Sequence, residues 1–83
     1  MSLLTIRRAR PGDEDALQLL AITDGALPLE GDALVAQLDG APVAAISLTD
    51  GRAIADPFRP SADTVEILRM RAKQELRALP AVA

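Results

Sequence analysis

The segment that decides the fold runs from residue 33 to residue 55 and reads ALVAQLDGAPVAAISLTDGRAIA. Two Asp-Gly pairs, Asp39-Gly40 and Asp50-Gly51, divide it into three short apolar runs. Asp-Gly between apolar runs is a strong hairpin signal, because a type I′ turn needs positive φ at both central positions. We therefore predict two type I′ turns and a three-stranded meander, with strands at 33–38, 43–48 and 52–55.

The middle strand of this meander is apolar on both faces. Simple alternation places Val43 and Ala45 on one face and Ala44, Ile46 and Leu48 on the other. A strand of this kind is typical of a sheet that is covered on both sides.

The residues before the meander predict a strand followed by a helix. Alternation over residues 3–9 indicates the strand. Pro11 suits the first helical position, and Gly25 suits the helix stop. The buried stripe of this helix would consist of Ala16, Leu17, Leu20 and Ala21.

A second helix is predicted over residues 62–79. Ser61 is its expected N-cap, and Pro80 ends it. Its buried stripe, at spacings of three and four, would be Val65, Leu68, Ala72, Leu76 and Leu79. Ile67 and Met70 flank this stripe and widen the apolar surface beyond what one small sheet covers.

Together these elements predict an α+β fold in one domain, residues 1–83. The sheet has four mostly antiparallel strands, and the order is strand, helix, three strands, helix.

The chain has 83 residues, a net charge of −3, one aromatic residue (Phe58), and no Cys, His, Trp or Tyr. These absences exclude disulfides, a thiolate nucleophile and an imidazole base. The acidic charge argues against a nucleic-acid partner, and no apolar run is long enough for a membrane span, so we expect a cytoplasmic protein.

Two charged clusters near the N-terminus are better explained by structural roles than by a metal site or a nucleic-acid site. Asp13, Glu14 and Asp15 are consecutive at a helix start, so their carboxylates diverge and suit the helix dipole better than a metal ion. Arg7, Arg8 and Arg10 should not form one basic patch for a nucleic acid, because Arg7 and Arg8 alternate across a strand.

Three stretches carry a resemblance to a known family: Thr5 to Asp13, Ala33 to Ala44, and Asp56-Pro57-Phe58-Arg59. Their order resembles the N-terminal half of the GNAT superfamily of N-acetyltransferases. The resemblance implies a strand-to-helix loop that binds the phosphates of acetyl-coenzyme A. It covers about half of that family's fold and lacks the fifth strand, so we expect the acetyl cleft not to form within one chain.

The loop itself departs from the family pattern. The family has glycine-rich sequence after an Arg or Gln, whereas Arg59 is followed here by Pro60, Ser61, Ala62 and Asp63. Proline offers no N–H to a phosphate, and Asp63 places a negative charge in the first helical turn. Arg59 and Ser61 remain the candidate residues for the acetyl-coenzyme A phosphates.

We therefore predict a non-catalytic, acetyltransferase-like protein without a cofactor, which acts as an interaction module or homodimer. The contact would use the edge strand 52–55 or the helix 62–79, because an uncovered edge invites pairing. The alternative is an acetyl-coenzyme A-dependent N-acetyltransferase whose site is completed by dimerisation. A third class, a subunit that binds an unknown protein partner, stays open.

Overall fold

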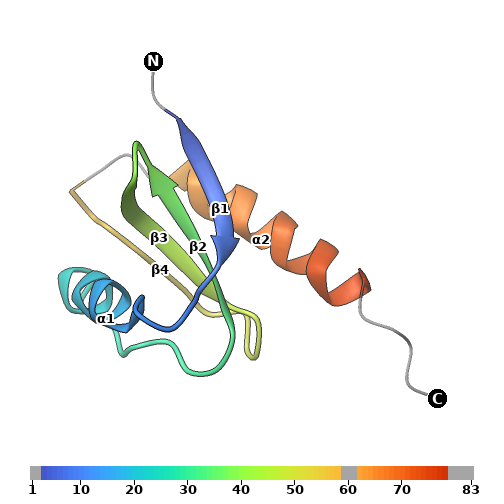
Figure 1. The fold of residues 1–83 in the computed structure, drawn as a ribbon, viewed down its shortest axis with the longest axis horizontal. Coiled ribbons are helices and arrows are strands. Elements are labelled where there is room, and N and C mark those ends of the chain that lie inside the picture. Colours follow the sequence, from blue (N-terminus) through green and yellow to red (C-terminus); the bar gives the residue numbers. More distant parts are fainter. Residues whose placement is uncertain (1–2, 59–61, 79–83) are drawn as a thin grey trace.

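The computed structural model describes residues 3–58 and 62–78, which form a four-stranded sheet with one helix on each face (Figure 1). The elements are β1 (Leu4–Arg8), α1 (Glu14–Thr23), β2 (Ala33–Leu38), β3 (Ala41–Ser47), β4 (Ala53–Ala55) and α2 (Ala62–Ala78). The predicted α+β class and element order are confirmed. Each of the three strand pairs is antiparallel, and the spatial order is β1-β2-β3-β4.

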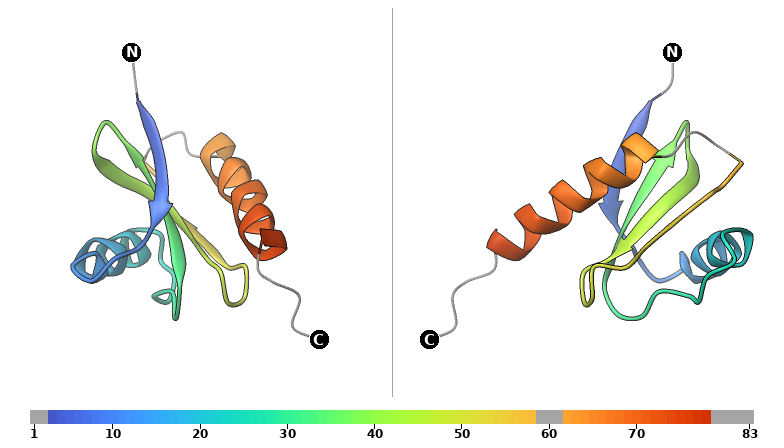
Figure 2. Two further views of the ribbon diagram at one scale, coloured as in Figure 1. Left: turned by 45° about the vertical axis from the view of Figure 1, so that its right-hand side comes forward. Right: turned by 180° about the vertical axis from the view of Figure 1, so that it is seen from behind.

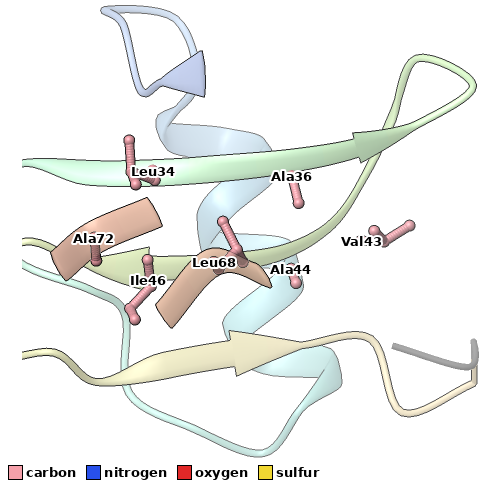
Figure 3. Packing of buried hydrophobic residues seen from close by; sticks show 7 residues of the cluster. All are labelled: Leu34, Ala36, Val43, Ala44, Ile46, Leu68 and Ala72. Atoms are coloured by element: carbon pink, nitrogen blue, oxygen red, sulfur yellow. The ribbon is translucent and has the colours of Figure 1, made fainter. Parts of the chain in front are cut away.

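The two helices lie on opposite faces of the sheet (Figure 2), as the doubly apolar β3 suggests. Each face carries its own buried cluster. The cluster under α2, shown in Figure 3, consists of Leu34, Ala36, Val43, Ala44, Ile46, Leu68 and Ala72. The cluster under α1 consists of Leu20, Ala21, Val35, Ala45 and Ile54.

The first Asp-Gly pair makes the predicted turn. Asp39 has φ of 52° and Gly40 has φ of 87°, and the flanking residues Leu38 and Ala41 are directly paired. This two-residue loop with positive φ at both positions confirms the type I′ prediction.

The second Asp-Gly pair makes a wider loop, so the type I′ prediction is wrong there. Of the two residues only Gly51 has positive φ (76°), and its N–H donates to the carbonyl of Ser47. The Ser47 hydroxyl accepts the N–H groups of Thr49 and Asp50, at 3.1 and 3.3 Å. The Asp50 side chain in turn accepts the N–H of Arg52 at 2.9 Å. These side-chain acceptors stabilise a longer loop, and β3 therefore ends at Ser47.

A β-bulge corrects the prediction for the faces of β3. Ala36 pairs with Ala44, but the next residue of β2 pairs with Pro42, so Val43 is an extra residue. Val43 consequently lies in the same buried cluster as Ala44 instead of sharing a face with Ala45.

The start of α1 also differs from the prediction. Pro11 is not the first helical residue, because Pro11 and Gly12 (φ 102°) occupy the centre of a turn closed by the N–H of Asp13 and the carbonyl of Arg10. Proline followed by a residue with positive φ is typical of a type II turn. The predicted stop is confirmed: Gly25, with φ of 69°, follows the end of α1.

The second helix covers the sheet with only part of its length. Leu68 and Ala72 are buried and Val65 is half-buried, as predicted, but Leu76 is 51% exposed. Figures 1 and 2 show the reason: the C-terminal part of α2 extends past the sheet. The placement of Leu76 on the buried stripe was therefore wrong, while Ser61 and Leu79 lie outside the described residues.

Candidate functional site

The turn after β4 is where the family resemblance predicts a phosphate site. Arg59 and Ser61, the two candidate residues, lie outside the described part of the chain. On the β4 side of the turn, the Asp56 carboxylate accepts the N–H of Phe58 at 2.8 Å. On the α2 side, Asp63 occupies the first helical turn. The described residues on either side of residues 59–61 in the sequence thus each include a carboxylate, a group that offers a phosphate no hydrogen-bond donor.

Asp13, the first acidic residue of the cluster before α1, has structural partners. Asp13 accepts two hydrogen bonds from the Arg7 guanidinium, at 2.7 and 3.0 Å, and one from the N–H of Arg10 at 2.6 Å. The Arg7 hydrogen bond holds the pKa of Asp13 well below its usual range. Among residues 3–58 and 62–78, no three carboxylates converge as a metal site would require.

The arginines of β1 diverge, as predicted. Arg7 reaches the start of α1, whereas Arg8 pairs on the other face with Glu75 of α2 at 3.3 Å. They form no common patch.

The edge strand β4 is partly closed by its own chain. It lies at one end of the sheet, as predicted, but it has only three residues. The N–H of Ala55 donates to the Asp24 side chain at 3.2 Å. The Arg52 guanidinium donates to the carbonyls of Leu27 and Pro28 at 2.7 and 2.6 Å, which ties the preceding loop to this end of the sheet. Short, covered edges resist strand addition, so β4 is the weaker of the two predicted contact regions.

The side of α2 that faces away from the sheet is the stronger candidate. We call Asp63, Ile67, Met70 and Gln74 the outer face of α2; their spacing of four, three and four places them on one side of the helix. Met70 is 62% exposed and Ile67 is 42% exposed. Glu66 and Lys73 flank this face, seven residues apart.

A second feature lies beside this face. A hollow of about 400 Å³, which we call the α2 groove, separates the second half of α2 from the loop after β3. Its apolar lining is Ile46, Leu48, Ala72 and Leu76, and its cationic lining is Arg69 and Lys73. The predictions from the sequence did not include this groove.

A larger hollow of about 570 Å³ lies at the start of α1. Its lining contains one cation, Arg10, and three carboxylates, those of Asp13, Glu14 and Asp32. The carboxylate of Asp13 forms an ion pair with Arg7. This arrangement favours no one ligand class.

No family model, curated protein or solved structure matches this chain. In the described part of the chain, neither helix has the length and apolar character needed to cross a membrane. The outer face of α2 and the α2 groove are the two candidate binding surfaces of the described chain.

Proposed function

We propose that this chain is a non-catalytic interaction module, resembling the first part of the GNAT fold, that forms a homodimer through the outer face of α2. The observation that carries the proposal is the exposure of Ile67 and Met70 on the side of α2 opposite the core. Covering both side chains with a second helix is favourable, because it removes their apolar surface from water.

The charge pattern of α2 favours a second copy of the same helix in antiparallel orientation. The start of α2 carries Asp63 and Glu66, whereas the cations Arg69, Arg71 and Lys73 follow further along the helix. The acidic Glu75 is paired with Arg8 of β1. Positions 63, 67, 70 and 74 follow the alternating spacing of a coiled-coil seam. In an antiparallel pair, Ile67 packs beside the partner's Met70.

The flanking charges are consistent with the same alignment. Glu66 and Lys73 lie on the same flank of the seam, so the two-fold axis places Glu66 beside the partner's Lys73, twice per dimer. One helix face is smaller than the standard contact of about 800 Å² per partner. We therefore expect a reversible dimer.

Non-catalytic character is supported by the turn between β4 and α2. Asp63 lies in the first turn of α2, close in sequence to the residues where the resemblance would put the coenzyme A phosphates. A carboxylate in the first helical turn competes with an anion for the positive end of the helix dipole.

Sedimentation equilibrium tests the dimer. The wild-type protein should show a mass that rises with concentration toward that of a dimer, and Met70→Glu should remain a monomer. Ile22→Glu is the matched control, since Ile22 is an exposed apolar residue (65%) on α1. A wild-type protein that stays monomeric, or equal losses in both variants, would contradict the proposal.

A further inference from the structure

We infer that the α2 groove binds a peptide segment in which an apolar side chain lies next to a carboxylate. This site lies on a different side of α2 from the outer face, but the two share Lys73, which lines the groove and also flanks the outer face. The monomeric Met70→Glu variant therefore tests the groove separately from the homodimer.

The apolar part of the groove is suited to one branched side chain. Ile46 and Ala72 belong to the buried cluster under α2, and Leu48 packs against that cluster. Leu76 lies on the part of α2 that extends past the sheet and is 51% exposed. An apolar side chain placed here would cover Leu76 and extend the existing core.

The cationic part of the groove is unpaired. Neither Arg69 nor Lys73 has an ion-pair partner among the residues that the structure describes. Elsewhere in the described chain, Arg7 and Arg8 are both paired, with Asp13 and Glu75. The distinctive feature is that Arg69 and Lys73 both line the same apolar hollow. In a chain with a net charge of −3, this local positive charge complements an acidic ligand.

The carboxylate within the groove does not neutralise these cations by contact. The Asp50 side chain accepts the N–H of Arg52, and this bond lowers the pKa of Asp50. With two cations and one carboxylate, the lining keeps an excess positive charge.

The loop wall of the groove argues against strand addition as the binding mode. The N–H groups of Thr49 and Asp50 are occupied by the Ser47 hydroxyl, and that of Gly51 by the Ser47 carbonyl. A ligand backbone finds few donors there, so recognition has to come from side chains: apolar contact with Leu76 and ion pairing with Arg69 and Lys73.

The test is a titration of ¹⁵N-labelled protein, followed by amide chemical shifts. The probe is the peptide acetyl-Leu-Asp-Glu-Leu-amide, and its control is the uncharged acetyl-Leu-Asn-Gln-Leu-amide. We expect saturable shifts at Leu48, Gly51, Ala72 and Leu76 with the acidic peptide only. The variants Arg69→Gln and Leu76→Gln should each weaken binding about tenfold, the effect of losing one good contact. Arg71→Gln, an exposed cation outside the groove, should leave binding unchanged.

Several results would overturn the inference: equal shifts with the uncharged peptide, shifts that map outside the groove, or no shifts at millimolar peptide. Octanoate is a third probe, and binding of octanoate without binding of the acidic peptide would mean that the occupant is not a peptide. Met70→Glu should keep peptide binding even as a monomer, so failure of the dimer and failure of the groove give different results.

Discussion

The guanidinium of Arg7 donates to both carboxylate oxygens of Asp13, with Nη1–Oδ2 at 2.7 Å and Nη2–Oδ1 at 3.0 Å. This bidentate pair joins β1 to the turn from which α1 begins. The Nε of Arg7 also donates to Gln37 of β2 at 3.3 Å. One side chain thus fixes the first helix relative to two strands.

The Arg7–Asp13 pair predicts an acid-sensitive step in stability. Its hydrogen bond lowers the pKa of Asp13 in the folded state, so the stability it contributes is present above the unfolded carboxyl pKa of about 3.9. That contribution is lost as the pH falls below this value. Asp13→Asn should lower the thermal midpoint at pH 7. Between pH 4 and pH 2.5, the thermal midpoint of this variant should fall less than that of the wild type. Arg8→Gln, at the more exposed pair, should have little effect. Identical acid dependence in the wild type and Asp13→Asn would refute this role.

Gly31 is predicted to be the glycine most sensitive to substitution. Its φ is 73°, and a Cβ there would lie 2.6 Å from Oγ1 of Thr49. Gly12 has φ of 102° but no atom within 4 Å of a Cβ. Gly12→Ala should cost about 1–2 kcal/mol for the left-handed backbone, and Gly31→Ala about 1 kcal/mol more, because Thr49 must leave its rotamer.

The added cost at Gly31 can be isolated with a double variant. The double variant Gly31→Ala with Thr49→Ala should be about 1 kcal/mol more stable to unfolding in urea than the sum of the two single changes predicts. The reason is that Thr49→Ala removes the Oγ1 atom that the new Cβ would contact. A double variant no more stable than the sum of the two single changes would show that the contact is unimportant.

The extension of α2 past the sheet predicts unequal effects for two leucines of one predicted stripe. Leu68 is fully buried, so Leu68→Ala should cost about 2–5 kcal/mol. Leu76 is half exposed, and Leu76→Ala should cost less than about 1 kcal/mol. Chemical denaturation measures both, and similar losses would mean that α2 packs along its whole length.

The meander was predictable because its signals are local. Asp39-Gly40 selects its turn by backbone preference alone, and β2 begins and ends at the predicted residues. The Val43 bulge was not predictable, since it depends on how β3 pairs with β2. The exposure of Leu76 likewise depends on the point at which α2 extends past the sheet. Helical periodicity shows which side of a helix is apolar, but not how much of its length the sheet covers.

The α2 groove was missed for a related reason. It requires the wide loop after β3, and that loop depends on Ser47 accepting two N–H groups. A serine two residues before Thr49-Asp50-Gly51 was a usable signal for such a loop, because serine side chains often close turns of this kind.

Charge exchange across the proposed dimer gives a further prediction. Glu66→Lys and Lys73→Glu should each weaken dimerisation about threefold to tenfold, because two attractive contacts per dimer become repulsive. The double exchange restores opposite charges and should recover most of the affinity. Sedimentation at low salt is the measurement, and a double variant weaker than either single variant would exclude the antiparallel alignment.

The acetyl-coenzyme A alternative has its own test. Calorimetric titration of the protein with acetyl-coenzyme A should give no binding heat, because Pro60 has no N–H to donate and Asp63 places a carboxylate in the first turn of α2. Micromolar binding that disappears in Arg59→Ala would instead make the turn between β4 and α2 a cofactor site.

The most direct test of the central claim is an isotope-filtered NMR experiment on a mixture of labelled and unlabelled protein. The measurement is made at concentrations where the two copies associate, and it detects only contacts between copies. We predict cross-peaks between the methyl groups of Ile67 in one copy and Met70 in the other. Intermolecular contacts that involve Leu19 and Ile22 of α1 instead, or none at all, would contradict a dimer formed through the outer face of α2.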